Sequence, residues 1–305
     1  MESFDTLIIG GGPAGLTASI YAKRAGLSMV CLDPSPMGGG QIVNTYEVDN
    51  YPGLPGISGM QLGMEMKKHA EKLGADIRVE TVQSVEKDGG LWKVVSNKET
   101  YLTRTIILCA GASNRKLGIP GEKELTGAGV SYCATCDGAF FRNKVTAVIG
   151  GGDVALEDAI FLSRFASKVY LIHRRDAFRG AKVLQDEALS IDKIEVLYDT
   201  IPDEIQGEGQ VNGLKVHNKK TGQSQLLPVN GVFIAVGTEP NTHDWAWLPD
   251  RDEKGYIIAG EDGITSIPGI FAAGDVRTKQ LRQVITAAAD GANAVTSVQR
   301  YLIEH

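Results

Sequence analysis

Two cysteines separated by two residues carry the clearest chemical signal in this 305-residue chain. Cys133 and Cys136 enclose Ala-Thr, and Asp137 follows the second cysteine directly. A C-x-x-C spacing allows a small disulfide ring, and the proximity of the thiols together with positive potential lowers the pKa of the attacking thiol. In a cytoplasmic α/β protein this spacing is a redox candidate. The motif therefore predicts a dithiol that cycles with a disulfide.

Zinc binding and inert burial are the competing interpretations of this pair. A structural zinc site needs four ligands, whereas Cys31 and Cys109 each stand within an apolar run and the five histidines are scattered. No metal is therefore expected. Cys31 and Cys109 are expected to be core residues, because a free cysteine packs as a small hydrophobic side chain.

Asp137 has two predicted roles, which do not exclude each other. A carboxylic acid beside the cysteine pair can protonate the leaving thiolate during disulfide exchange, which is general-acid catalysis. An aspartate can also cap the start of a helix by accepting hydrogen bonds from its free backbone N–H groups.

Two stretches of the chain, residues 6–32 and 145–172, share one design. In each, an apolar, β-branched run leads into three glycines and a helical pattern, and a second apolar run follows. Strand, glycine turn, helix and strand form a βαβ unit with a parallel sheet. The sequence therefore predicts an α/β fold with two Rossmann-like dinucleotide-binding domains.

The second domain is predicted to be inserted into the first. Strands at 106–108 and 232–236 close the two copies, but a third strand at 269–273 has no glycine turn of its own. It is expected to return to an existing domain, followed by a helix over 287–302. The predicted limits are 1–115 and 243–305 for the first domain and 116–242 for the second. The crossings near 114–120 and 240–243 carry Pro or Gly beside polar residues, as linkers do.

The glycine turns have the spacing of phosphate cradles. The first glycine makes a tight turn, the second lets the backbone approach a pyrophosphate, and the third lets helix and strand pack closely. The pyrophosphate then binds the free N–H groups of a helix N-terminus. Merely structural turns are the alternative. The residues expected to contact nucleotides are Gly10, Gly12, Pro13, Ala14 and Gly15 in the first copy, and Gly150, Gly152, Asp153 and Gly237 in the second.

The end of the second strand distinguishes the two nucleotides. In the first copy Asp33 can accept a hydrogen bond from a ribose hydroxyl, whereas arginines accommodate a 2′-phosphate. In the second copy His173 is followed by Arg174, Arg175 and Arg179, whose guanidinium forks match phosphate oxygens. The first copy should hold FAD or NAD, and the second NADPH. A solvated basic turn is the alternative for the arginines.

Two nucleotide cradles and a cysteine pair resemble the low-molecular-weight, bacterial-type thioredoxin reductases. The resemblance covers nearly the whole chain, and C-A-T-C-D before a second G-x-G-x-x-A is specific for that family. The matching segments are residues 10–15, 38–41, 47–53, 133–137, 150–155, 173–179, 274–275 and 282–283.

The resemblance implies a homodimer with an FAD domain interrupted by a smaller NADPH domain. It implies that FAD is contacted by Gly39, Gly40, Gln41, Asn50, Gly274, Asp275, Arg282 and Gln283. Within that set Asp275 would bind the ribityl chain, and Arg282 with Gln283 would lie near the flavin ring.

The resemblance also implies a reaction. NADPH reduces FAD, reduced flavin reduces the Cys133–Cys136 disulfide, and the dithiol reduces thioredoxin. By position, Cys136 faces the flavin and Cys133 attacks thioredoxin. The domains rotate between two states in this family, with the hinge expected at the two crossings.

The chain departs from the family pattern at two places, and other functions stay open. Val154 stands where a Ser or Thr is usual, so one phosphate-facing hydroxyl is missing. Trp245 and Trp247 are atypical; core or hinge packing is expected, with a partner contact as the alternative. The electron donor could be ferredoxin or NADH, or the substrate another dithiol protein. A redox sensor without useful turnover is the remaining class.

The composition limits partners and compartment. Thirty-seven acidic against 31 basic residues give a net charge of −6, which argues against a broad nucleic-acid footprint. The mean hydropathy is −0.08, and no apolar run approaches the ~20 residues that span a bilayer. The acidic start is unlike a signal peptide, and four cysteines are too few for a secreted disulfide scaffold. We expect a soluble cytoplasmic protein.

Overall fold

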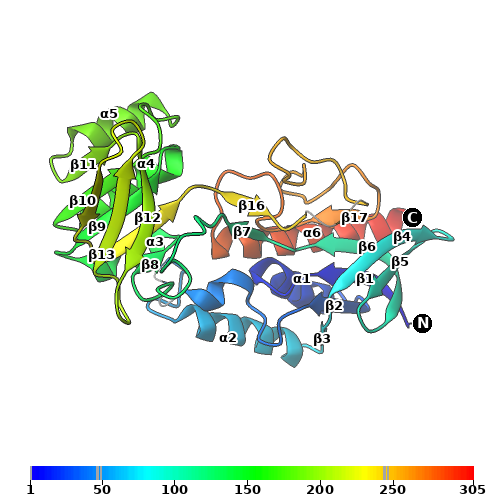
Figure 1. Cartoon of the computed structure of the whole chain (residues 1–305). Coiled ribbons are helices and arrows are strands. Elements are labelled where there is room, and N and C mark those ends of the chain that lie inside the picture. Colours follow the sequence, from blue (N-terminus) through cyan, green and yellow to red (C-terminus); the bar gives the residue numbers. More distant parts are fainter. Residues whose placement is uncertain (1, 46–47, 49, 243–244, 246) are drawn as a thin grey trace. The chain divides into compact units, whose positions relative to one another are not determined.

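The computed structural model describes residues 2–45, 48, 50–242, 245 and 247–305 (Figure 1). The chain divides into two compact units. Unit 1 consists of Met1–Ser113 and Glu239–His305, and unit 2 of Asn114–Thr238. Each unit is built on a sheet with parallel strands flanked by helices. The predicted α/β fold, with one βαβ domain inserted into another, is therefore confirmed.

Unit 1 contains a seven-stranded sheet within its described residues. The strands are β1 (Glu2–Ile9), β2 (Met29–Asp33), β3 (Asp76–Val79), β4 (Val82–Asp88), β5 (Leu91–Ser96), β6 (Thr100–Leu108) and β17 (Ile270–Ala272). Their order is β3-β2-β1-β6-β5-β4, with β17 on β6. The β4–β5–β6 pairs are antiparallel and the others parallel. Because β17 pairs with β6, the third strand returns to the first domain as predicted.

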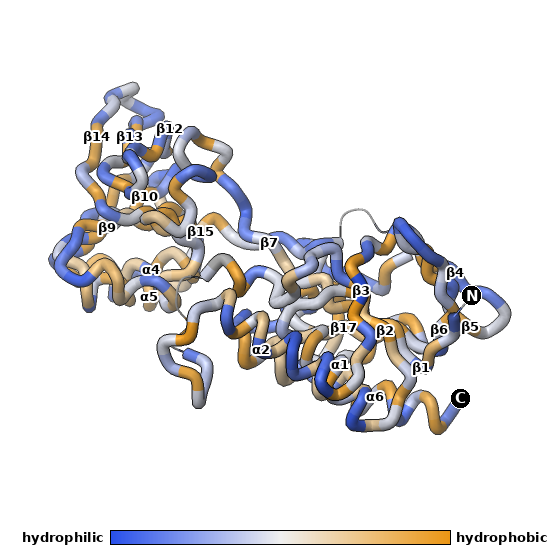
Figure 2. Tube along the Cα trace, turned by 90° about the horizontal axis from the view of Figure 1, so that it is seen from below, coloured by the Kyte–Doolittle hydropathy of each residue, from blue (hydrophilic) through white to orange (hydrophobic). Residues whose placement is uncertain are grey.

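The helices of unit 1 are α1 (Pro13–Arg24), α2 (Gly59–Lys72) and α6 (Val284–Glu304), with a 3₁₀ turn η1 (Gly40–Asn44). Helices α1 and α6 approach so closely at Gly291 that a Cβ there would lie 2.2 Å from the Ala14 carbonyl oxygen. The central strands consist mostly of apolar residues, whereas the edge strand β4 is mostly polar (Figure 2). Cys31 and Cys109 lie in this core, as predicted.

Unit 2 contains a five-stranded parallel sheet in the order β11-β10-β9-β15-β8. Its strands are β8 (Val130–Ser131), β9 (Val145–Gly150), β10 (Lys168–Ile172), β11 (Ile194–Leu197) and β15 (Gly231–Ala235). A separate antiparallel sheet contains β12 (Thr200–Gln206), β13 (Gly213–Asn218) and β14 (Ser224–Leu227). The helices are α3 (Ala134–Asp137), α4 (Asp153–Ser163) and α5 (Lys182–Ser190), with a 3₁₀ turn η2 (Gly138–Phe141).

Two short strands mark the places where the chain passes from one unit to the other. They are β7 (Ala112–Asn114) and β16 (Thr238–Pro240), which pair with each other. Part of the matching segment 47–53, namely Glu47 and Asp49, lies outside the described residues, as does His243 of the second predicted crossing.

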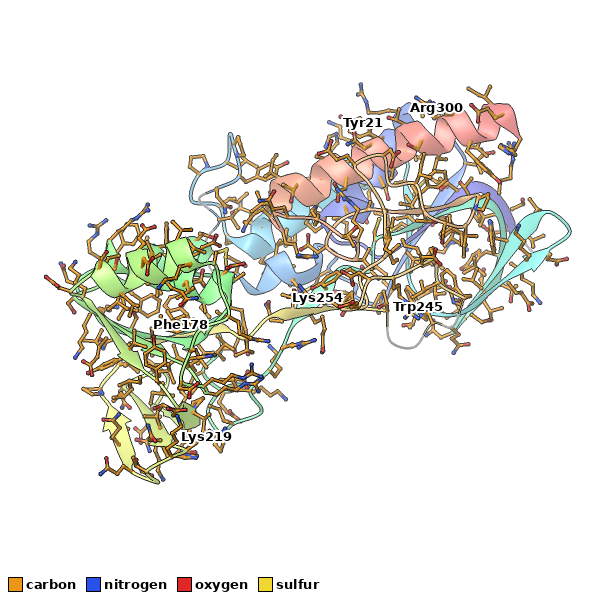
Figure 3. All side chains as sticks on the ribbon, turned by 90° about the horizontal axis from the view of Figure 1, so that it is seen from above. Tyr21, Phe178, Lys219, Trp245, Lys254 and Arg300 are labelled. Atoms are coloured by element: carbon orange, nitrogen blue, oxygen red, sulfur yellow. A yellow bond between two sulfur atoms is a disulfide. The ribbon has the colours of Figure 1, made fainter. Side chains whose placement is uncertain are left out.

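The two atypical tryptophans pack in unit 1. The rings of Trp245 (labelled in Figure 3) and Trp247 stack with centroids 5.4 Å apart, and both lie against the main core of that unit. The predicted packing role is confirmed for these two side chains. Ala246 between them lies outside the described residues.

Candidate functional site

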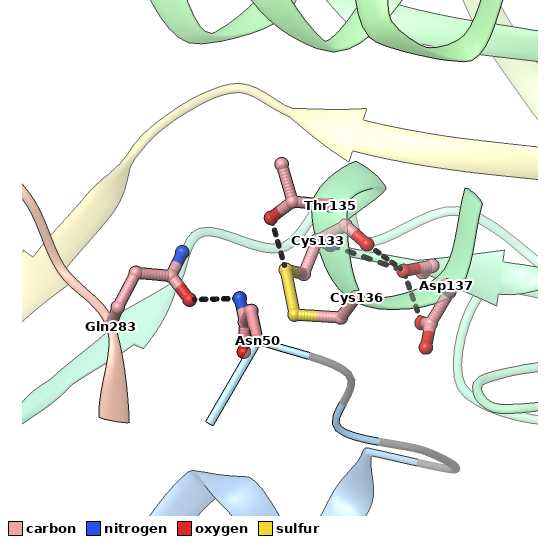
Figure 4. The surroundings of a disulfide bond; sticks show 7 residues. Asn50, Cys133, Thr135, Cys136, Asp137 and Gln283 are labelled. Carbon is pink, nitrogen blue, oxygen red and sulfur yellow. Dashed lines mark hydrogen bonds between the residues drawn. A yellow bond between two sulfur atoms is a disulfide. The ribbon is translucent and has the colours of Figure 1, made fainter. Parts of the chain in front are cut away.

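The two redox cysteines form a disulfide in unit 2, with Cα atoms 5.3 Å apart (Figure 4). Both are half-buried, and the Thr135 hydroxyl lies 3.4 Å from Cys133 Sγ. By contrast Cys31 and Cys109 are fully enclosed, and burial raises the pKa of the Cys31 thiol to about 12. Thiolate chemistry therefore belongs to the Cys133–Cys136 pair.

Asp137 is held by a serine that the sequence did not single out. The Ser131 hydroxyl donates to Asp137 Oδ2 at 2.6 Å and accepts a hydrogen bond from the Cys133 N–H at 3.1 Å (Figure 4). Asp137 Oδ1 is buried and has no hydrogen-bond partner among the described residues. Asp137 stands at the N-cap position of the 3₁₀ turn η2, but its side chain accepts no capping hydrogen bond there, so the predicted capping role of the carboxylate is not observed.

Burial raises the pKa of Asp137, and the hydrogen bond from Ser131 partly opposes that rise. Because the Ser131 O–H occupies Oδ2, a proton on the carboxyl group is placed on Oδ1. Asp137 thus keeps a proton to higher pH than an ordinary aspartate does, which suits a general acid.

The glycines of the turn in unit 1 differ in whether a side chain would fit at their position. A Cβ on Gly10 would lie 2.4 Å from the Cys109 carbonyl oxygen, and one on Gly15 would lie 1.8 Å from the Gly10 carbonyl oxygen. These two glycines allow α1 to pack on the sheet. At Gly12 the nearest atom to such a Cβ is 3.8 Å away. Gly12 precedes Pro13 and α1 without a side-chain cap, so the helix N–H groups face open space suited to an anion.

Asp33 lies over the middle of this turn. Its carboxylate accepts hydrogen bonds from the N–H groups of Gly11 and Ser35. A Cβ on Gly11 would collide with the Asp33 side chain. Asp33 therefore fixes the turn, and its unused lone pairs remain available to a ribose hydroxyl.

Two further segments meet the turn of unit 1. The Gly39 N–H donates to the Gly11 carbonyl at 2.7 Å, and a Cβ on Gly40 would lie 3.1 Å from Gly12 Cα. A Cβ on Gly274 would lie 2.8 Å from Ala14 Cβ. The fold thus brings three glycine segments to the start of α1. Gln41 follows Gly40 and is exposed.

Four further residues were predicted to contact the flavin. Asp275, Arg282 and Gln283 precede α6 in the chain, and Asn50 forms a hydrogen bond with Gln283. Asn50 donates to Gln283 Oε1 at 2.9 Å (Figure 4), and Gln283 caps α6. The Arg282 guanidinium stacks over the Tyr256 ring. Asp275 Oδ1 is buried and has no hydrogen-bond partner among the described side chains.

The turn of unit 2 repeats the design. A Cβ on Gly150 would lie 2.4 Å from the Ala235 carbonyl oxygen, whereas one on Gly152 would meet no atom of the described residues within 4 Å. Asp153 begins α4, and its carboxylate accepts the Ala181 N–H at 2.6 Å. Val154 is exposed. Asp153 thus ties the segment after the arginines to the helix start. At the end of the closing strand, Gly237 has φ +106° and open space around it.

His173 is buried beneath the same turn. A Cβ on Gly151 would lie 2.2 Å from the imidazole, whose Nε2–H donates to the Ala177 carbonyl at 3.0 Å. Phe178 (labelled in Figure 3) packs beside the ring. Burial lowers the pKa of His173, which favours the neutral imidazole. His173 shapes the turn, as Asp33 does in unit 1.

The three arginines point outward from this buried support. Arg174, Arg175 and Arg179 are exposed, and none forms an ion pair with a described carboxylate. The Arg179 N–H donates to the Gly151 carbonyl at 2.8 Å, which joins the arginine loop to the glycine turn. Three guanidinium groups free of carboxylates are suited to a phosphate dianion.

Replacing Gly152 by Ala is expected to weaken NADPH binding without unfolding unit 2. The new methyl group meets no atom within 4 Å in the part of the chain that the structure describes, but it occupies the space predicted for a pyrophosphate. We expect the KM for NADPH to rise roughly tenfold or more, since hydrogen bonds to charged groups contribute about 1.5–3 kcal/mol. The free energy of unfolding should fall by at most about 1 kcal/mol.

Gly150→Ala is the matched contrast, because its Cβ would lie 2.4 Å from the Ala235 carbonyl oxygen. That variant should lose thermal stability. Calorimetry and NADPH kinetics on both variants provide the measurement. An unchanged KM in Gly152→Ala would show that no ligand approaches this glycine.

The described residues contain no group of three or more His, Cys, Asp or Glu that could hold a metal ion. None of the described helices combines the length and apolar character needed to cross a bilayer.

The chain was compared with known families, proteins and solved structures. The family model of the pyridine nucleotide-disulphide oxidoreductases matches residues 4–291. The thioredoxin reductase of Listeria monocytogenes is 45% identical over 99% of this chain and 94% of its own length. The thioredoxin reductase structure from Streptococcus pyogenes is 46% identical with a TM-score of 0.91, and covers 99% of both chains. That from Giardia duodenalis is 37% identical with a TM-score of 0.90, and covers 99% of this chain and 100% of its own.

Proposed function

The chain belongs to the pyridine nucleotide-disulphide oxidoreductase family, and we propose that it reduces the disulfide of thioredoxin with electrons from NADPH. The observation that carries the proposal is the half-buried Cys133–Cys136 disulfide beside a carboxyl group of raised pKa. Relatives named thioredoxin reductase match the whole chain and support the choice of substrate.

Unit 1 fits FAD. The support is the open position at Gly12 before α1, the Asp33 carboxylate over the turn, and the buried Asp275 Oδ1, to which no described residue donates a hydrogen bond. These groups would bind a pyrophosphate, a ribose hydroxyl and a ribityl hydroxyl respectively. When bound, FAD supplies a two-electron carrier between nicotinamide and disulfide. The domain assigned to FAD is 1–115 with 243–305.

Unit 2 fits NADPH. Gly152 leaves the α4 N-terminus open to a pyrophosphate, and the three exposed arginines supply donors for a 2′-phosphate. Val154 offers no hydroxyl to this site. The domain assigned to NADPH is 116–242, and the chain is proposed to act as a homodimer.

The chemistry of the cysteines is thiol–disulfide exchange. The Cys133 thiolate attacks one sulfur of the thioredoxin disulfide, and the other thioredoxin sulfur leaves as a thiolate. Cys136 then attacks Cys133 Sγ, which restores the Cys133–Cys136 disulfide and releases the second thioredoxin sulfur. Each leaving thiolate takes up one proton, and Asp137 Oδ1 is the proposed donor for one of them.

Asp137 gives the exchange step a pH dependence. Because a general acid acts when protonated, the rate should fall as the pH rises through the raised pKa of Asp137. Ser131→Ala removes a hydrogen bond that favours the ionised form, so it should raise that pKa and move the fall to higher pH. Asp137→Asn should abolish the fall and slow exchange by roughly 10²-fold or more.

Stopped-flow measurement of thioredoxin reduction and of flavin reduction across pH separates the two steps. Asp137→Asn should slow the first more than the second. The reverse order would remove the general-acid role of Asp137.

The proposed function is tested by steady-state oxidation of NADPH with thioredoxin as acceptor. NADPH oxidation that requires thioredoxin is expected. Turnover that requires reduced ferredoxin or NADH in place of NADPH would favour one of these alternative donors. Turnover with another dithiol protein but not with thioredoxin would favour an alternative substrate. Catalytically silent protein would favour a redox sensor.

A further inference from the structure

A cluster of buried charges supports the Gly274–Asp275 turn in unit 1. It joins Asp290 on α6 to Arg277 and Lys279, which follow β17. The side chains of all three are only 6–7% exposed. Asp290 Oδ1 accepts from Arg277 Nη2 at 2.6 Å. Asp290 Oδ2 accepts from Arg277 Nε at 2.8 Å and from Lys279 Nζ at 2.9 Å.

One carboxylate and two cations leave this cluster with a single positive charge. A buried charge is stable only when it is paired. A further anion beside the cluster is Asp275, whose Oδ1 lies 4.0 Å from Lys279 Nζ. Lys279 therefore lies between two carboxylates, and an ionised Asp275, whose side chain is partly exposed, balances the positive charge that remains on the three buried groups.

The cluster also fixes the backbone of the turn. The Gly274 N–H donates to Asp290 Oδ2 at 2.9 Å. On its other side Gly274 touches α1, where an added Cβ would lie 2.8 Å from Ala14 Cβ. The turn is thus held between α6 and the start of α1, and Asp275 follows it directly.

We propose that Lys279 is a positioning residue for flavin binding, which with Asp290 and Arg277 holds the turn and keeps the Asp275 carboxylate ionised for a ribityl hydroxyl. The inference rests on the proposed function, because it takes FAD as the ligand of unit 1. Asp275 Oδ1 is buried and accepts no hydrogen bond from the residues that the structure describes, and an ionised oxygen there gains most from a ligand hydroxyl.

The charges around Asp275 support this role for Lys279. Burial raises the pKa of Asp275, and Lys279 opposes the rise most strongly, ahead of Arg282 and Arg277, while Asp290 adds to it. Burial would also raise the pKa of Asp290, but its hydrogen bonds to Arg277 and Lys279 outweigh burial and lower it. Removing the Lys279 charge should therefore let Asp275 take up a proton nearer neutral pH.

The test is the affinity of the apoprotein for FAD, measured by quenching of flavin fluorescence between about pH 6 and pH 8.5. The wild-type Kd should be nearly constant over this range. In Lys279→Met the Kd for FAD should be about tenfold or more above the wild-type value near pH 6 and should approach the wild-type value near pH 8.5. The reason is that the charge-assisted hydrogen bond from the ligand to Asp275 is lost only when Asp275 is protonated. Lys279→Arg should restore the flat profile.

Lys98, exposed on the turn between β5 and β6, provides the matched control, and Lys98→Met should bind FAD as wild type does. If Lys279→Met does not fold, Lys279→Gln removes the charge while keeping a donor for Asp290. A pH-independent loss of affinity in the neutral variants, or no loss, would overturn the role of Lys279. Absence of FAD binding by the wild-type chain would instead overturn the proposed function.

Discussion

Cys133→Ser is expected to abolish thioredoxin reduction while leaving FAD and NADPH binding intact. The serine hydroxyl is a poor nucleophile towards sulfur, and the half-buried disulfide with Cys136 can no longer form. We expect turnover with thioredoxin to fall by about a thousandfold or more, as losses of a nucleophile do. Turnover with thioredoxin should fall by as much in Cys136→Ser, because the exchange cannot be completed without the second thiol. The measurement is NADPH oxidation with thioredoxin, alongside the flavin spectrum.

Thr135→Ser is the control for this pair, since it keeps the hydroxyl that lies 3.4 Å from Cys133 Sγ. It should retain near wild-type turnover. Normal thioredoxin reduction by Cys133→Ser would contradict the dithiol assignment.

Arg174→Ala combined with Arg175→Ala is expected to raise the KM for NADPH while leaving that for NADH nearly unchanged. Both guanidinium groups are exposed and free of described carboxylate partners, so only contacts to the 2′-phosphate are removed. Loss of two charge-assisted contacts should raise the KM about 10²-fold or more. Steady-state kinetics with each nucleotide measures the ratio.

Arg164, exposed at the end of α4, offers a matched control, and Arg164→Ala should alter neither KM. Equal effects of the double substitution on NADPH and NADH would contradict a phosphate clamp. Such a result would favour a solvated basic turn.

The periodic parts of the fold could be predicted from the sequence. Strand, glycine turn and helix follow one another within about 30 residues, so local pattern determines them. The first residues of one strand and one helix differ from those that the sequence pattern predicts. β1 starts at Glu2 rather than Thr6, because pairing of Glu2 with Tyr101 extends it through polar residues. Helix α6 starts at Val284, where Gln283 and Thr286 form a capping box.

The roles of individual side chains in the cradles were harder to predict. His173 and Asp153 fit a nucleotide motif, yet His173 is buried against Gly151 and Asp153 binds the Ala181 N–H. His173 supports the glycine turn from within the core, whereas the exposed Asp153 holds the segment at Ala181 against the start of α4. A motif gives the type and spacing of residues, but the direction of a side chain depends on segments distant in the sequence.

Ser131 and Lys279 show what the sequence could not reveal. Ser131 lies six residues from Asp137 across a strand end and a helical turn, so its hydrogen bond depends on the three-dimensional path. Lys279 and Asp290 are joined through packing of α6 on the segment after β17. Neither contact has a local pattern, because single serine and lysine residues occur throughout the chain.

Anaerobic titration of the purified protein with NADPH, followed by flavin absorbance, tests the central claim most directly. Complete bleaching of the flavin should require about two equivalents of NADPH per flavin, because flavin and disulfide each accept two electrons. Bleaching after a single equivalent would show that the Cys133–Cys136 disulfide is not reduced. Flavin that resists NADPH but bleaches with dithionite would contradict the proposed donor.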